Sequence, residues 1–199
     1  MIAIVDYGAG NLTSVKKAFD HLAVDTVVTA DLSVLSSAEK IVVPGVGHFA
    51  ATNRLTASGL RTGVLDAISR GVPFLGICVG MQWLFESSEE APDTPGLGLL
   101  PGLCEHFPGE VKSPHVGWNQ LHLHGTSILM EGIPQDSFVY FTHSYRAPIV
   151  QETTAATEYG GRFSAAVERK NVFGVQFHPE KSSDVGLRIL GNFCGIRPC

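Results

Sequence analysis

Short apolar runs alternate with segments of helical periodicity through the first half of the chain. The run IAIVDYG is followed by NLTSVKKAFDHL, in which apolar residues recur every three or four positions. The same rhythm continues through TVVTA, KIVVPG, LRTGVLDAISRG and VPFLGI. Alternating buried strands and helices are typical of a parallel sheet flanked by helices. We therefore predict an α/β fold with a mainly parallel central sheet.

The pattern changes from residue 95 onwards. The segments there are rich in turns and alternate apolar with polar residues, as in GLGLLPG, NQLHLHG, FVYFTHSY and GRFSAAVERKNVFGVQFHPE. This texture predicts hairpins and antiparallel or mixed strands in the second half. A last helix is expected around SSDVGLRILGNF. Because no linker or repeat interrupts the chain, we expect one domain over residues 1–199.

The composition of the chain is that of a protein with a sizeable buried core. Of its 199 residues 44% are hydrophobic and 17% are charged. The net charge is -5 and there is no Lys/Arg block, so a nucleic-acid surface is not expected. The apolar runs are too short to span a bilayer and the N-terminus does not resemble a signal peptide, which predicts a cytoplasmic protein.

The cysteines are irregularly spaced and form no C-x-x-C pair, which argues against a disulfide framework or a zinc site. We expect free thiols at all of them, namely Cys78, Cys104, Cys194 and Cys199. His122 and His124 alternate in LHLH and could share one strand face, but no third ligand lies nearby. No metal site is therefore predicted.

Cys78 lies where a strand is expected to turn into a helix, in PFLGICVGMQWLF. This order of elements around G-x-C-x-G is that of a nucleophile elbow. Gly76 and Gly80 allow a tight turn that would hold Cys78 strained and exposed above the sheet. The helix N-terminus favours the thiolate, and the Val79 N–H would face an oxyanion. The five residues alone fit a buried core cysteine equally well.

A thiol nucleophile needs a base, and FGVQFHPEKS offers one. Residues 172–177 are predicted to form a buried strand, and Pro179 ends its hydrogen-bond ladder just after His178. Glu180 follows two residues after His178. A carboxylate beside an imidazole fixes its tautomer and supports its charged form. We therefore assign His178 as the base and Glu180 as the group that orients it.

The segment VVPGVGHF predicts a buried strand that runs into a turn at Gly45 and Gly47. In a parallel sheet this turn lies at the same edge as the elbow. A backbone N–H near Val46 could then complete an oxyanion hole with that of Val79. An ordinary tight turn explains the local sequence equally well.

Taken together, G-x-C-x-G-x-Q, a distant H-P-E and an upstream P-G-x-G resemble the class I, triad-type glutamine amidotransferases. The similarity extends over residues 4–182 and is closest to one branch of that class, the glutaminase subunits of imidazole glycerol phosphate synthases. The segments that carry it occur in this order: IVDYGAGNL, VPGVGHF, GICVGMQWLFE, PHVGWNQ, YFTHSYR, YGGRF and VQFHPEKS.

The resemblance implies a reaction and a partner. Cys78 would attack the side-chain amide carbon of glutamine, His178 would transfer protons, and Glu180 would orient His178 while a glutamyl thioester forms and is hydrolysed. The ammonia would pass to a (β/α)8-barrel cyclase in a heterodimer. That partner makes imidazole glycerol phosphate and aminoimidazole carboxamide ribotide in histidine biosynthesis. No cofactor or metal is implied.

The resemblance also implies binding positions. Those for glutamine are Gly47, Gln82, His143, Ser144 and Tyr145. Those facing the cyclase are Asn11, Trp118 and Lys181. The chain departs from the family at two positions, with Val79 where leucine is expected and His48 where a small residue is common.

Three alternatives remain from the sequence. A glutaminase subunit of the pyridoxal phosphate synthase has similar size, but PHVGWNQ argues against it. A thiol hydrolase or peptidase of the related elbow fold is disfavoured by Gln82. A non-catalytic binding domain is disfavoured because Cys78, His178 and Glu180 are all intact.

Overall fold

A computed structural model describes residues 1–197, so Cys199 lies outside the described residues. Within them the main sheet has eight strands in the order β2-β1-β3-β4-β13-β12-β11-β8. Its parallel strands are β1 (Ile2–Val5), β2 (Thr26–Thr29), β3 (Lys40–Gly45), β4 (Phe74–Cys78) and β13 (Val172–Val175). Its antiparallel strands are β8 (His122–Leu123), β11 (Thr153–Glu158) and β12 (Arg162–Arg169). The predicted α/β fold with antiparallel strands in the second half is confirmed.

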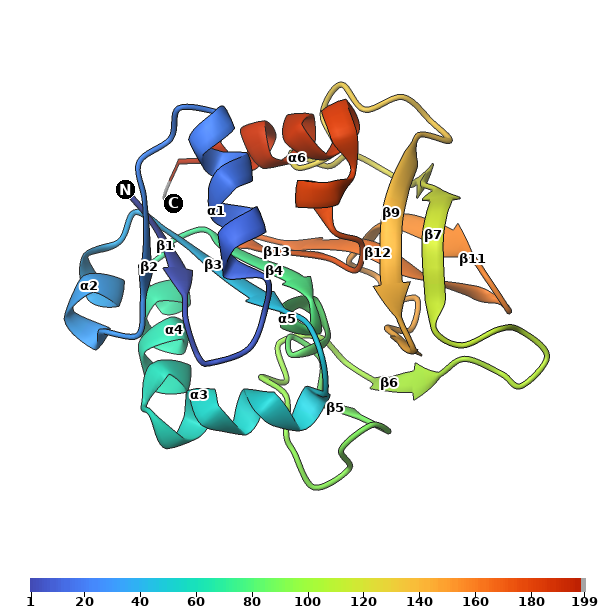
Figure 1. The fold of residues 1–199 in the computed structure, drawn as a ribbon, viewed down its shortest axis with the longest axis horizontal. Coiled ribbons are helices and arrows are strands. Elements are labelled where there is room, and N and C mark those ends of the chain that lie inside the picture. The colour runs from blue at the N-terminus through green and yellow to red at the C-terminus, as the bar shows by residue number, and fades with distance from the viewer. Residues whose placement is uncertain (198–199) are drawn as a thin grey trace.

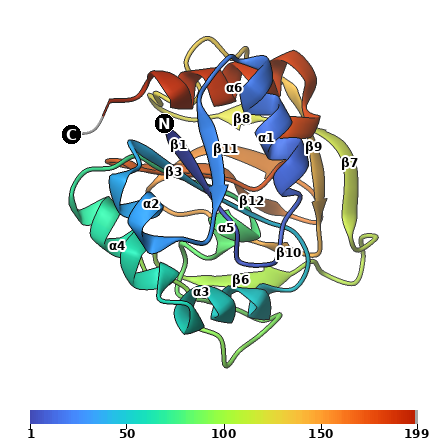
Figure 2. The same cartoon turned by 60° about the vertical axis from the view of Figure 1, so that its left-hand side comes forward.

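Helices cover both faces of this sheet (Figures 1 and 2). On one face lie α1 (Leu12–His21) and α6 (Ser183–Gly195), and on the other lie α3 (Asn53–Ala57) and α4 (Leu60–Ser69). The short α2 (Leu32–Ser37) packs against α4, and η1 (Phe49–Thr52) leads into α3. Each long helix buries its apolar stripe, as α1 does with Val15, Ala18 and Phe19.

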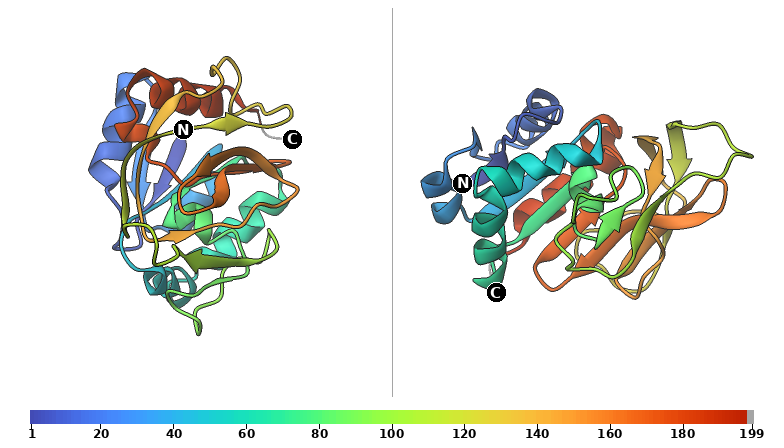
Figure 3. Two further views of the ribbon diagram at one scale, coloured as in Figure 1. Left: turned by 90° about the vertical axis from the view of Figure 1, so that its right-hand side faces the viewer. Right: turned by 90° about the horizontal axis from the view of Figure 1, so that it is seen from below.

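Two smaller sheets stand at the end of the molecule toward which β3 and β4 run (Figures 1 and 3). One is the antiparallel ribbon of β7 (His115–Gln120) and β9 (Phe138–His143). The other contains β5 (Ser87–Ser88), β6 (Leu103–His106) and β10 (Tyr145–Arg146). Both sheets therefore stand beside the carboxyl edge of the parallel strands, where ligands bind in open α/β sheets.

The core lies on both faces of the central strands. Every residue of β3 and β4 is buried, whereas the edge strand β2 is half-buried throughout. This is why the central strands have continuous apolar runs rather than an alternating pattern. Within residues 1–197 no helix combines the length and hydropathy needed to cross a bilayer.

The turn after β4 packs so closely on the sheet that glycine is required at two positions. A Cβ on Gly80 would lie 1.8 Å from the carbonyl oxygen of Val43, and one on Gly76 would lie 2.3 Å from that of Gly80. Both neighbours are backbone atoms, which cannot move aside by a rotamer change. The backbone after Cys78 thus lies directly against β3.

We predict that Gly80→Ala lowers the free energy of unfolding by about 1–3 kcal/mol or more, because the added methyl overpacks the core. Gly191→Ala is the matched control, since that glycine lies inside α6 with nothing within 4 Å of an added Cβ. It should stabilise the protein by about 0.5–1 kcal/mol, because alanine has the higher helix propensity. Denaturant unfolding of both variants measures the difference, and equal stabilities would contradict the packing argument.

Candidate active site

Cys78 adopts a strained backbone conformation at the end of β4. Its φ is 54° and its ψ is -110°, a region that residues with a Cβ rarely occupy. The next residues form α5 (Val79–Gln82), a helix of a single turn, where the sequence predicts a helix. The predicted nucleophile elbow is present, and the glycines on either side of Cys78 provide the space for it.

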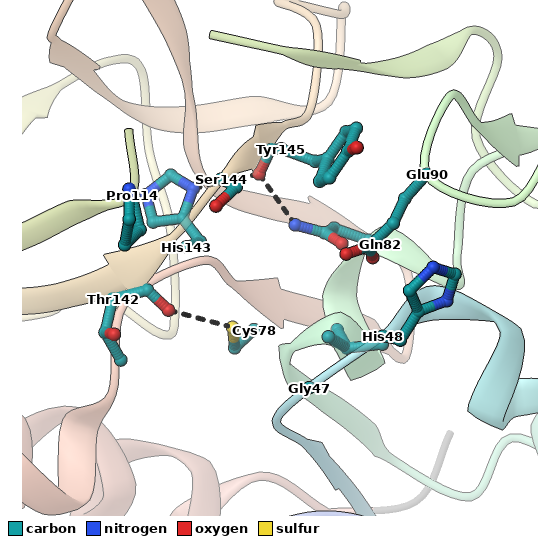
Figure 4. A pocket seen from close by; sticks show the side chains of 11 residues that line it. Gly47, His48, Cys78, Gln82, Glu90, Pro114, Thr142, His143, Ser144 and Tyr145 are labelled. Carbon is teal, nitrogen blue, oxygen red and sulfur yellow. Dashed lines mark hydrogen bonds between the residues drawn. The ribbon is translucent and has the colours of Figure 1, made fainter. Parts of the chain in front are cut away.

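The Cys78 thiol lies at the base of a cavity of about 370 Å³ (Figure 4). The prediction that this residue is exposed is wrong, because only 3% of it is accessible. The end of β9 packs against the thiol, with the backbone oxygen of Thr142 within 4.0 Å of the sulfur. The cavity is lined by Gly47, His48, Cys78, Val79, Gln82, Glu90, Pro114, Thr142, His143, Ser144 and Tyr145.

Two polar groups hold the sulfur. The Cys78 thiol donates to the backbone oxygen of Thr142 at 4.0 Å, and Nε2 of Gln176 donates to Sγ at 3.7 Å. Gln176 is completely buried just beyond β13. The sequence analysis did not identify Gln176, because its contact with Cys78 depends on the pairing of β13 with β4.

His178 and Glu180 form a buried pair beside the thiol. Nδ1 of His178 lies 2.8 Å from Oε1 of Glu180, and both side chains are 1% exposed. Glu180 lies within η2 (Pro179–Lys181). The backbone N–H of His178 donates to the backbone oxygen of Tyr140 at 2.9 Å. Nε2 of His178 has no hydrogen-bond partner among the described residues. It therefore remains free for a reacting group.

The charged form of His178 is favoured by its neighbours. Desolvation lowers the pKa of His178, but its interactions with Cys78 and with the Glu180 carboxylate outweigh it and raise the pKa to about 10. The imidazolium is thus stable at neutral pH beside the sulfur. An imidazolium in this position stabilises a thiolate, which is the nucleophilic form of cysteine.

Gln82 and Glu90 supply polar groups to the cavity wall. Nε2 of Gln82 donates to the backbone oxygen of Tyr145 at 2.8 Å and to Oε1 of Gln176 at 3.1 Å. Glu90 follows β5, and its Oε2 accepts from the Phe49 N–H at 2.7 Å. The sequence analysis missed Glu90, since an acidic residue in a loop carries no local signal of function.

The turn at Val46 lies beside the elbow, as predicted from the sequence. Gly45, at the end of β3, is the strand partner of Cys78. Gly47 follows Val46 with φ at 97°, lines the cavity and has open space around its Cα. Val46 is half-buried and Val79 is buried. The two residues predicted to form an oxyanion hole therefore directly follow two neighbouring strands, Val46 after β3 and Val79 after β4.

The structure brings together two of the three residues predicted to face a partner. Trp118 is 50% exposed and its ring centroid lies 6.0 Å from that of Tyr140. Lys181 places Nζ 5.7 Å from the centroid of the same ring. Asn11 caps the start of α1, where its Oδ1 accepts from the Ser14 N–H. The helix α1 itself contacts η2.

The described cysteines and the two alternating histidines form no metal site. Cys78, Cys104 and Cys194 are free thiols. His122 pairs with Asp136 at 2.8 Å, and His124 contacts Arg162. Among residues 1–197 no three side chains of the His, Cys, Asp or Glu types gather as metal ligands would.

The sequence matches known proteins over nearly its whole length. Residues 3–195 match the family described as glutamine amidotransferase class-I. The imidazole glycerol phosphate synthase subunit HisH of Moorella thermoacetica is 48% identical over 195 residues, covering 96% of this chain and 93% of that protein. The subunit of the same name from Methanothermobacter thermautotrophicus is 46% identical over 197 residues, covering 98% of both.

Solved structures share the fold at lower identity. A crystal structure of a glutamine amidotransferase has a TM-score of 0.76 and 19% identity, covering 98% of this chain and 100% of the other. The structure of PurLQS from Thermotoga maritima has a TM-score of 0.73 and 19% identity, covering 97% of this chain and 96% of the other. The family match and the close relatives establish that the chain belongs to the class-I glutamine amidotransferases and, among them, to the imidazole glycerol phosphate synthase subunits HisH.

Proposed function

We propose that this chain hydrolyses the side-chain amide of glutamine to glutamate and ammonia, as the glutamine amidotransferase subunit of an imidazole glycerol phosphate synthase in histidine biosynthesis. The observation that carries the proposal is the strained Cys78 at the base of a cavity, beside the buried pair of His178 and Glu180. The names of the close relatives favour this synthase over one that makes pyridoxal phosphate.

The reaction begins when the Cys78 thiolate attacks the amide carbon of glutamine. A C–S bond forms, and the carbonyl oxygen becomes an oxyanion that accepts hydrogen bonds from the backbone N–H groups of Val79 and Val46. His178 gives its Nε2 proton to the leaving nitrogen, and ammonia departs as the C–N bond breaks. Glu180 accepts from Nδ1 of His178 and keeps Nε2 directed at the sulfur.

Hydrolysis of the thioester completes the cycle. The neutral His178 now accepts a proton from water through Nε2, and the resulting hydroxide equivalent attacks the thioester carbon. A second oxyanion forms in the same place as the first and collapses with cleavage of the C–S bond. Glutamate is released, and the pair of Cys78 thiolate and His178 imidazolium is restored.

The cavity wall supplies groups that suit the rest of glutamine. Gln82 and the backbone from His143 through Ser144 to Tyr145 offer hydrogen-bonding groups, and Gly47 leaves room beside them. The Glu90 carboxylate is complementary to the α-ammonium group of an amino acid. Glu90 thereby adds a recognition residue that the sequence analysis did not propose.

The ammonia is delivered to a cyclase partner, a (β/α)8 barrel that forms a heterodimer with this chain. The relatives are named as subunits of a synthase, which supports the existence of a partner subunit. Trp118 presents a large exposed apolar ring next to Lys181 on the surface near η2. Asn11, Trp118 and Lys181 form the proposed contact, and the chemistry of this chain needs no cofactor.

We predict that Cys78→Ala reduces glutamine hydrolysis to less than a hundredth of the wild-type rate, because no other group can form the thioester. The reaction of the cyclase complex with added ammonia should be unchanged, since the thiol is needed only to release ammonia. Steady-state assays with glutamine and with ammonium salt measure both activities. Retention of glutamine hydrolysis in the variant would contradict the assignment of the nucleophile.

We predict that Glu180→Gln lowers turnover less than Cys78→Ala does, because the orienting member is the least costly to lose from a triad. The Glu180 carboxylate contributes to the raised pKa of His178, so its removal lowers that pKa. The imidazolium is then lost at lower pH, and the alkaline limb of the kcat/KM profile should move to lower pH. Glu131→Gln, at an exposed position, serves as the control. An unmoved alkaline limb would show that Glu180 does not act on His178.

A further inference from the structure

His115 is a buried histidine that the reaction does not use. It begins β7 and is 4% exposed. Its ring stacks between Phe141 and Tyr159, with centroid distances of 4.9 and 4.0 Å and interplanar angles of 22° and 16°. His143 lies opposite His115 on β9 and is 6% exposed. Because the stacking fixes the plane of His115, it also fixes the directions of its two ring nitrogens.

Both rings belong to one row of hydrogen bonds. Nδ2 of Asn119 lies 3.3 Å from Nε2 of His115, whose Nδ1 lies 3.4 Å from Nε2 of His143. Nδ1 of His143 lies 2.9 Å from the backbone oxygen of Tyr145. The row therefore runs from β7 through the aromatic cluster to the wall of the active-site cavity.

Each end of the row fixes the direction in which its protons point. A backbone carbonyl only accepts, so Nδ1 of His143 donates to Tyr145 and its Nε2 accepts. Nδ1 of His115 must then donate, which leaves its Nε2 to accept. At the other end, Nδ2 of Asn119 donates to the backbone oxygen of Glu158 at 3.1 Å. Oδ1 of Asn119 accepts from the backbone N–H of Gln120 at 2.8 Å. The Asn119 amide thus donates to Nε2 of His115, which agrees with the direction set by the Tyr145 carbonyl.

The alternation of donors and acceptors requires both rings to be neutral. Desolvation lowers the pKa of His115 to about 4. Desolvation also lowers the pKa of His143, to about 3, although its bond to Tyr145 opposes the shift. Both histidines are therefore neutral at pH 7, and each carries its proton on Nδ1.

The row continues beyond Tyr145 to the nucleophile. The Tyr145 oxygen also accepts from Gln82, whose Nε2 donates in turn to Oε1 of Gln176. This orientation leaves Nε2 of Gln176 as the donor to Cys78 Sγ. Every amide and ring in the path has one orientation that satisfies its neighbours, so the pocket wall is held in a single arrangement.

We propose that Asn119, His115 and His143 are positioning residues for glutamine binding. Their hydrogen-bond chain holds the Tyr145 carbonyl in place and, through it, the side chain of Gln82. The inference rests on the proposed function, in which Gln82 and the backbone near Tyr145 bind glutamine. Asn119 directly follows Trp118, so the row of hydrogen bonds begins next to the surface proposed for the partner.

Two substitutions at His115 separate positioning from simple core packing. His115→Phe keeps an aromatic ring between Phe141 and Tyr159 but removes the donor to His143. It should raise the KM for glutamine about three- to tenfold, the effect of one lost hydrogen bond, with kcat changed less. His115→Asn loses the ring but keeps an N–H close to the position of Nδ1. It should be the less stable variant and yet have a KM closer to that of wild type.

The same substitutions at His122 are the matched controls. That half-buried histidine pairs with Asp136 and takes no part in the row of hydrogen bonds. The His122 substitutions should leave the KM unchanged. Nitrogen-15 NMR of the intact wild-type chain at pH 7 gives an independent readout that does not depend on activity. It should show the Nδ1–H tautomer for both His115 and His143.

Two results would overturn the proposal. One is an Nε2–H tautomer or an imidazolium at either His115 or His143 in the wild-type chain. The other is a KM for His115→Phe within twofold of wild type, which would make His115 only a packing residue. A wild-type chain that shows both Nδ1–H tautomers but hydrolyses no glutamine would contradict the proposed function and still support the hydrogen-bond chain.

Discussion

The close approach of three backbone segments at the end of β4 is the constraint on which the site depends. The Val43 carbonyl, Gly76 and Gly80 meet with no space for a side chain between them. This contact holds Cys78 at a φ of 54°, which costs roughly 1–3 kcal/mol that burial of the central strands offsets. The same contact places the cysteine beside Gly45 and the Val46 turn.

Around this fixed thiol, three buried histidines are held in different protonation states by their neighbours. His178 has a carboxylate within 2.8 Å, and its charged form is favoured. His115 and His143 lie among aromatic rings, and their neutral forms are favoured. The division suits the proposed reaction, in which one histidine moves protons while two others keep their protons in place and so preserve the shape of the pocket.

The sequence predicted those features that depend on local pattern. Apolar runs predicted the parallel strands, and the spacing of Gly76, Cys78 and Gly80 predicted the elbow. The burial of Cys78 could not be predicted, because it depends on contact with a chain segment about sixty residues away in the sequence. Glu90 and Gln176 were missed for the same reason, since only the folded chain brings Gln176 to the thiol and Glu90 to the cavity wall.

We propose that, among the thiols of residues 1–197, only Cys78 is activated by the fold. Burial raises the pKa of Cys104, and it raises the pKa of Cys194 to about 11, so both remain protonated at neutral pH. The most direct test is to treat the intact chain with the electrophilic glutamine analogue diazo-oxo-norleucine and to locate the adduct by peptide mass mapping. A single adduct at Cys78, suppressed by glutamine, is the result expected. Labelling of Cys104, Cys194 or Cys199 with Cys78 unmodified would contradict the account.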